Sequence, residues 1–151
     1  MTMTFKTPSD LLGAEGTNLG VTSWEVITQE RINLFADATG DHQWIHVDPE
    51  QAKDGPFGAT IAHGYLTLSL TNLFLPDLLE VTQVSMGINY GVNKVRFPSP
   101  VTVGSRVRGQ GMITEVTEIS GGVQVIVSLT VEIENQPKPA CVVESISRFL
   151  S

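Results

Sequence analysis

The sequence has few of the features that mark secreted, membrane-bound or nucleic-acid-binding proteins. It contains a single cysteine, Cys141, among 151 residues, which excludes an internal disulfide and a cluster of cysteine thiolates around a metal. Basic residues are also scarce, since 9 Lys and Arg stand against 16 Asp and Glu, for a net charge of −7. Because phosphate binding favours a basic face, we expect no nucleic-acid partner.

Long apolar runs are absent as well. The first ten residues contain nothing like the apolar core of a signal peptide, and no uncharged apolar stretch of about 18 residues follows. The sequence therefore predicts no membrane partner and a cytoplasmic location. No repeat, linker or low-complexity tract divides the chain, so we expect one domain over residues 1–151, with residues 1–20 as an N-terminal extension that holds a short helix.

The apolar residues that are present are sufficient for a core. Hydrophobic residues make up 41% of the chain and charged residues 17%, a balance typical of folded soluble proteins. A domain of this size buries roughly two-thirds of the surface that its unfolded chain exposes, so it needs no covalent staple.

The first half of the chain reads mainly as helices, with one short strand at 23–27. Capping residues predict helix starts at Thr7, Thr28 and Asp48, and Gly40 ends the second helix. From Tyr65 to Leu75 the apolar side chains lie on every face of a helix, which must then be covered on most sides. A sheet wrapped around a lone helix meets that requirement, and Pro76 would kink or restart the helix.

After Glu80 the pattern changes to that of strands. Five stretches rich in Val, Ile and Thr are separated by Gly, Pro and Asn, with a hairpin turn predicted at Ser120-Gly121-Gly122; they span 81–90, 93–97, 105–118, 123–134 and 140–149. Helices followed by a run of strands predict an α+β fold with a largely antiparallel sheet.

One stretch carries side chains suited to acid–base chemistry. Asp41 and His46 follow Gly40, and a non-helical backbone between them would let both side chains point to one place. A carboxylate beside an imidazole can polarise a water molecule or move a proton. Gly64 opens the apolar helix, where an unpaired backbone N–H favours developing negative charge. Together these groups suit chemistry beside a carbonyl.

Structural explanations exist for each of these residues. Asp41 could form an Asx turn, His46 could be a hydrogen-bonded, half-buried histidine, and His63 could orient the loop before the helix. Gly64 could serve only the close approach of helix and strand. The set of Asp41, His46 and His63 would in principle suit a non-haem metal, but its spacing is not diagnostic, and we expect no metal.

In order along the chain, these residues resemble the R-specific enoyl-CoA hydratases of the MaoC-like dehydratase family. The resemblance covers roughly residues 20–150 and departs from the family motif at Gln43-Trp44-Ile45, where the family has Asn and Pro, which affects the floor of the pocket. The matching segments are Gly40-Asp41 with the step to His46, Ala62-His63-Gly64, Asn89-Tyr90-Gly91, Arg96-Phe97 and Pro100-Val101-x-Val-Gly104.

The resemblance implies a hot-dog fold, in which the sheet curls around the central apolar helix, and at least a homodimer. It implies reversible addition of water to trans-2-enoyl-CoA, giving the (R)-3-hydroxyacyl product, with the CoA part of the substrate and no other cofactor. Asp41 and His46 would hold the water and the Gly64 N–H would receive the negative charge. Substrate-binding candidates are His63, Asn89, Tyr90, Asn93, Lys94 and Arg96, the last two for CoA phosphates.

The length of the acyl chain would depend on how side chains close a tunnel, with Trp44, Leu66, Leu70 and Phe74 as candidates. Two other functions stay open at this point. A carboxylate-activated water could attack the thioester carbonyl itself, which would make the protein an acyl-CoA thioesterase. The domain could also be a non-catalytic acyl-binding subunit that uses the tunnel alone.

Overall fold

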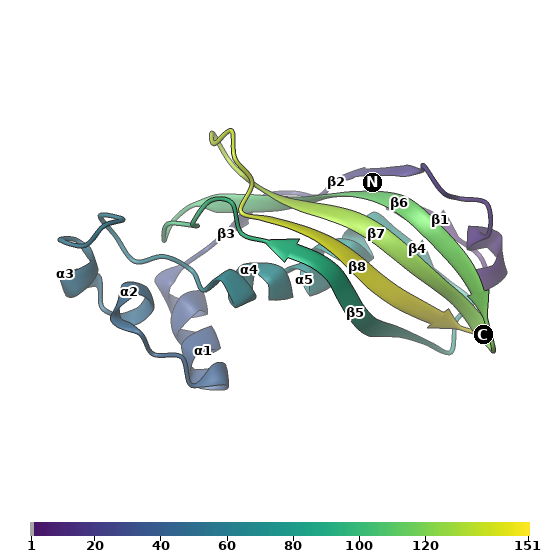
Figure 1. Cartoon of the computed structure of the whole chain (residues 1–151), viewed down its shortest axis with the longest axis horizontal. Coiled ribbons are helices and arrows are strands. Elements are labelled where there is room, and N and C mark those ends of the chain that lie inside the picture. Colours follow the sequence, from purple (N-terminus) through teal and green to yellow (C-terminus); the bar gives the residue numbers. More distant parts are fainter. Residues whose placement is uncertain (1) are drawn as a thin grey trace.

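The computed structural model describes residues 2–151 and consists of a curved sheet with a pair of helices along its inner face (Figure 1). The sheet is six-stranded and antiparallel, in the order β2-β6-β7-β8-β5, with β3 also paired to β6. Its strands are β2 (Asn18–Val21), β3 (Glu25–Val26), β5 (Met86–Arg96), β6 (Arg106–Ile119), β7 (Gly122–Ile133) and β8 (Cys141–Leu150). A separate parallel pair joins β1 (Met3–Phe5) to β4 (Leu79–Val81).

The helices fall into two groups. Helices α4 (Gly64–Ser69) and α5 (Thr71–Leu78) run beneath the sheet, whereas a helical lobe projects beyond one end of it, at the left of Figure 1. This lobe contains α1 (Gln29–Thr39), α2 (Trp44–Val47) and α3 (Pro49–Ala52), and a short 3-10 helix, η1, spans Pro8–Leu11. Within residues 2–151, no helix has the length and apolarity needed to cross a bilayer.

Most of the expected strands are confirmed, including the hairpin turn between β6 and β7, where Gly121 has a φ of 85°. The break expected between 90 and 93 is wrong, because 86–96 form the single strand β5. Its pairing with β8 shifts register at Asn89/Gly91 and again at Val92/Val95. The glycine and asparagines that looked like a turn are therefore accommodated by irregularities within one strand.

The N-terminal extension contains more than the expected short helix. That helix is confirmed as η1, where the Asp10 carboxylate accepts the Thr7 N–H at 3.0 Å. The prediction missed β1 and β2, and β2 forms one edge of the main sheet. Leu11 and Leu19 are buried in the core, so this segment is packed into the domain.

The central helix differs from the prediction in two ways. It is divided at Leu70 into α4 and α5, and Pro76 lies inside α5. The sheet buries one side of this pair through Leu66, Leu70 and Phe74. Tyr65 remains 71% exposed, so the expectation of cover on most sides is wrong for the single chain.

A glycine on β6 lets α5 lie directly against the sheet. A Cβ atom at Gly109 would sit 2.6 Å from the Cβ atom of Phe74, a separation that side chains do not tolerate. On β8, two strands from β6 in the sheet, Cys141 is fully buried, as expected for a small core side chain. Burial raises the pKa of the Cys141 thiol to about 11, so the thiol is neutral near pH 7.

We predict that Gly109→Ala lowers the free energy of unfolding by about 1–3 kcal/mol, because the new methyl group forces Phe74 away from the sheet. The matched control is Gly87→Ala on β5, whose Cβ would meet Phe149 at an ordinary 3.4 Å. Urea unfolding followed by circular dichroism measures both. A Gly109→Ala midpoint equal to or above that of the control would contradict this account of the helix–sheet contact.

Candidate active site

Helix α1 ends where the site begins. As predicted, Thr28 caps its start by accepting the Arg31 N–H at 3.1 Å, and Gly40 ends it in the left-handed conformation with a φ of 84°. The Gly40 N–H donates to the Ala36 carbonyl at 2.8 Å. Because glycine adopts this conformation without strain, the chain can turn sharply and place Asp41 directly after the helix.

The expected non-helical backbone between Asp41 and His46 is present only at residues 41–43. The one-turn helix α2 follows over Trp44–Val47 and contains His46. One oxygen of the Asp41 carboxylate accepts the Gln43 N–H at 3.3 Å, the Asx-type contact that favours such a turn. The structural explanation for Asp41 is thus correct, and its second oxygen is still available for chemistry.

His46 is buried and held through its Nδ1 atom, which lies 2.7 Å from the Ile61 carbonyl oxygen. A carbonyl can only accept, so Nδ1 carries the proton and Nε2 of the neutral ring carries the lone pair. The Gln29 side chain donates to the His46 carbonyl at 2.8 Å and accepts from Thr60. The sequence analysis did not identify Gln29 as a site residue, because nothing in the sequence distinguishes it from any other polar residue in the first turn of a helix.

The segment 60–63 is tied to the segment that follows β5. The Ala62 N–H donates to the Val101 carbonyl at 2.8 Å, and the Val103 N–H donates to the Thr60 carbonyl at 2.9 Å. Through these bonds, the Pro100–Gly104 segment holds the segment that carries His63 and Gly64 in place. The bonds fix the start of α4 beside α2.

Gly64 combines the two roles considered for it. The Phe97 ring lies 3.1 Å from where a Cβ atom would stand, a tight contact that glycine avoids. Among residues 2–151, no backbone or side-chain acceptor takes the Gly64 N–H. It is therefore a free donor at the beginning of α4.

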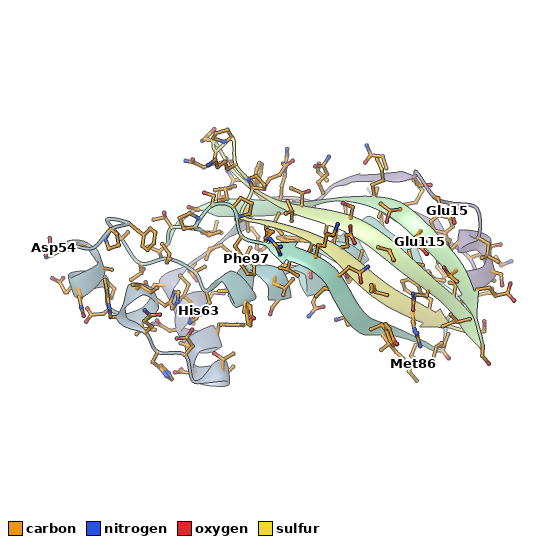
Figure 2. The ribbon with its side chains drawn as sticks, viewed as in Figure 1. Glu15, Asp54, His63, Met86, Phe97 and Glu115 are labelled. Carbon is orange, nitrogen blue, oxygen red and sulfur yellow. The ribbon has the colours of Figure 1, made fainter. Side chains whose placement is uncertain are left out.

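Asp41, His46 and His63 converge, with one donor atom from each lying within 4.8 Å of the others. They line an open hollow of about 380 Å³, which we call the dyad hollow after Asp41 and His46. Figure 2 shows His63 where the helical lobe meets α4, with Phe97 near the end of β5. The remaining lining residues are Phe35, Thr39, Gly64, Tyr65 and Phe97.

The arrangement of the two imidazoles suits a metal poorly. The His46 and His63 rings are stacked, with centroids 3.9 Å apart and planes 21° from parallel. Lone pairs lie in the plane of each ring, so those of stacked rings run side by side. A zinc ion would need both nitrogens to point at one position about 2.0–2.1 Å away. The absence of a metal stays a prediction, and this geometry supports it.

The other predicted site residues lie on β5, outside the dyad hollow. Asn89 donates to Asn72 of α5 at 2.6 Å, and the Tyr90 ring lies under the Arg148 guanidinium at 3.5 Å. Asn93 is exposed. Lys94 and Arg96 share a separate hollow of about 290 Å³ with Ser128, Val142, Val143 and Glu144.

The residues proposed for the acyl tunnel do not line the dyad hollow either. Leu66, Leu70 and Phe74 belong to the core against the sheet, and Trp44 packs over Gly55, whose added Cβ would meet its ring at 3.0 Å. The apolar wall comes instead from Phe35, Tyr65 and Phe97. Phe35 was recognisable from the apolar stripe of the helix that Thr28 begins, and Tyr65 from its place at the start of the apolar helix, but neither pattern indicated a pocket wall.

With this geometry in place, comparison with known proteins identifies the family. A sequence model described as MaoC like domain matches residues 11–135. The chain is 55% identical over 149 residues to 3-hydroxyacyl-thioester dehydratase Z of Mycobacterium tuberculosis (strain ATCC 25618 / H37Rv), covering 98% of this chain and 99% of that protein. It is also 47% identical over 138 residues to nodulation protein N of Rhizobium meliloti (strain 1021), covering 87% and 84%.

Among solved structures, the unliganded R-hydratase PhaJ1 from Pseudomonas aeruginosa superposes with a TM-score of 0.78 at 21% identity, covering 96% of this chain and 86% of that one. At that identity the likeness establishes the fold, which is the hot-dog fold that the resemblance implied. Together with the sequence matches, it shows that the chain belongs to the MaoC-like domain family and is an enzyme of the dehydratase type.

Proposed function

We propose that this protein is an R-specific enoyl-CoA hydratase, which reversibly adds water to trans-2-enoyl-CoA and gives (R)-3-hydroxyacyl-CoA. The observation that carries the proposal is the convergence of the Asp41 carboxylate and the His46 imidazole in an open hollow, beside the free N–H of Gly64. The relative that is 55% identical is named as a dehydratase of 3-hydroxyacyl thioesters, the reverse direction of this reaction.

The dyad suits one water molecule. A water has two O–H groups, which can be donated to the Asp41 carboxylate and to Nε2 of His46 while a lone pair of its oxygen faces the substrate. The hydrogen bond from Nδ1 to the Ile61 carbonyl supports this role, because it leaves Nε2 as an acceptor. Water alone is a weak nucleophile at neutral pH, so the removal of its proton must accompany its attack.

In the hydration direction, the water oxygen bonds to the β-carbon as the Asp41 carboxylate takes its proton. The electron pair of the C=C bond moves toward the thioester, whose oxygen becomes negative and accepts the Gly64 N–H. The proton then passes to the α-carbon on the same face, so water has been added and no electron donor is required. Losing one donor to such an oxyanion typically costs about 3 kcal/mol of transition-state stabilisation.

The walls of the dyad hollow are suited to the acyl part of the substrate. Phe35, Tyr65 and Phe97 surround the polar groups with aromatic surface, and exclusion of water there would strengthen each charge interaction. Lys94 and Arg96 are the candidates for the CoA phosphates. Arg96 is the last residue of β5 and immediately precedes Phe97. The end of β5 therefore connects the hollow that holds Lys94 and Arg96 to the aromatic wall of the dyad hollow.

We predict that Asp41→Asn and His46→Asn fold normally but lower kcat for crotonyl-CoA hydration by about 10²–10⁴. Asn at 41 keeps an oxygen for the Gln43 N–H, and Asn at 46 keeps a donor near the Ile61 carbonyl, so each variant removes chemistry and retains its structural bond. Loss of enoyl absorbance measures the rate, and thermal unfolding checks the fold.

Thiol release and acyl-CoA binding, measured beside the hydration rate, separate the two other functions. A thioesterase would release free thiol from a saturated acyl-CoA, and a non-catalytic subunit would bind acyl-CoA with no turnover in the wild type. Correctly folded variants that hydrate crotonyl-CoA within twofold of the wild type would contradict the role of the dyad.

We further propose that the protein assembles as a homodimer through β5. This strand is eleven residues long, lies at an edge of the sheet and is exposed along almost its whole length. Its apolar side chains include Ile88 and Val92, which are 39% and 45% exposed. An open edge with such side chains favours pairing with another strand, and the exposed Tyr65 of α4 also requires cover.

We predict that Val92→Lys shifts the protein toward the monomer, because a charge is placed on the edge that pairs. Val21→Lys on β2, the short opposite edge of the sheet, is the matched control and should leave assembly unchanged. Size-exclusion chromatography with light scattering gives the mass. A wild type with the mass of one chain, or equal behaviour of the two variants, would contradict assembly through β5.

A further inference from the structure

His63 contacts both members of the dyad although it is itself almost completely buried, with 3% of its surface exposed. Its Nε2 atom lies 2.9 Å from the main-chain oxygen of Asp41, across 22 positions of the sequence. One face of its ring stacks on His46 at 3.9 Å, and Phe35 lies against the ring at 4.9 Å with a tilt of 55°. His63 is thus held between a helix of the lobe and the dyad.

The hydrogen bonds determine how the proton is placed on His63. The Asp41 carbonyl only accepts, so Nε2 must donate and Nδ1 carries the lone pair of the neutral ring. Nδ1 is buried and has no hydrogen-bond partner within residues 2–151. An N–H at this position would be buried without an acceptor, which costs free energy. His63 therefore suits the role of a fixed hydrogen-bond donor better than that of an acid or base.

Asp41 needs such a support because its other hydrogen bonds are long. It is exposed, its N–H is 3.4 Å from the Thr39 hydroxyl, and its carboxylate is 3.3 Å from the Gln43 N–H. The bond from His63 is the shortest of the three. It connects the Asp41 loop to His63, the residue that directly precedes Gly64. The bond therefore fixes the position of the Asp41 carboxylate relative to the free Gly64 N–H.

His46 needs a second constraint for a different reason. Its bond to Ile61 fixes one nitrogen, but a ring held at one atom can still rotate about that contact. The His63 ring, stacked against its face, sets the plane of the imidazole and hence the direction of its Nε2 lone pair.

We propose that His63 is a positioning residue. Its Nε2–H bond holds Asp41 at the dyad, its ring holds the plane of His46, and it does not touch the substrate. This inference rests on the proposed hydratase function and assigns His63 a role other than substrate binding. A displacement of about 1 Å in a reacting group can cost about 10²-fold in rate, so the effect should be seen in kcat.

The test uses three variants that separate the two contacts. His63→Gln keeps a donor near the position of Nε2 and removes the ring, His63→Phe keeps the ring and removes the donor, and His63→Asn removes both. We expect kcat for crotonyl-CoA to fall about 10-fold for the first two and about 100-fold for the third, with KM within about threefold of the wild type. The matched control is His42→Gln, since His42 is exposed and bonds to Asp37.

A double-mutant cycle shows whether His63 acts through Asp41. Adding His63→Asn to Asp41→Asn should lower kcat only about 10-fold beyond Asp41→Asn alone, because the carboxylate being positioned is already gone and only the support of the His46 plane is lost. A full 100-fold further loss would contradict the inference. So would a His63→Asn variant with normal kcat, or one that raises KM and leaves kcat unchanged, which would indicate substrate contact.

If His63→Phe does not fold, the comparison of His63→Gln with His63→Asn still tests whether the Nε2–H bond matters. Equal losses in these two smaller variants would contradict the role of the Nε2–H bond. A wild-type protein with no hydratase activity would refute the proposed function, whereas an active wild type with a normal His63→Asn variant refutes only the role of His63.

Discussion

The hydrogen bond from Nδ1 of His46 to the carbonyl of Ile61 is the contact on which the rest of the site depends. It joins the one-turn helix α2 to the segment before α4, beside a backbone bond in which the Ile61 N–H donates to the Ile45 carbonyl at 3.0 Å. It also decides which nitrogen of His46 carries the lone pair. Without it, Nε2 of His46 would no longer be set as the acceptor that faces the nearby carboxylate.

The sheet supports this contact from a distance. The segment 60–63 is bonded to residues 101–103, which follow β5, and α4 continues into α5, which is packed on β6 over Gly109. The core therefore fixes one half of the site firmly. The other half, from Gly40 to His46, lies in the helical lobe beyond the sheet (Figure 1) and depends on local turns and on the contacts of Gln29, His46 and His63.

The sequence predicted the parts of this structure that are set by local chemistry. Thr28 and Gly40 mark the ends of α1 because a side-chain cap and a left-handed glycine act within one turn. The long strands β6, β7 and β8 follow from their alternation. The helix α2 was missed because four residues give no periodic signal. The sequence analysis divided β5 into two strands because Gly and Asn, which mark its irregularities, are also the residues that favour turns.

The sequence predicted the two central residues of the site, Asp41 and His46, but not the residues that surround and support them. Asp41 and His46 were identified from their spacing and the family resemblance, and their side chains do converge. The supporting contacts of Gln29, Phe97 and His63 depend on which segments fold together, which no single stretch of sequence records. Likewise, an apolar helix predicts that cover is needed, but Tyr65 is 71% exposed, so the sheet does not cover the helix on all sides.

The central claim is that one water molecule, held by Asp41 and His46, supplies both the oxygen and the proton from one side of the substrate. Hydration of crotonyl-CoA in D₂O, followed by chiral analysis and NMR of the product, tests it directly. The account predicts a 3R alcohol with one deuterium at the α-carbon, on the same face as the new hydroxyl. A 3S alcohol, or a deuterium on the opposite face, would contradict it.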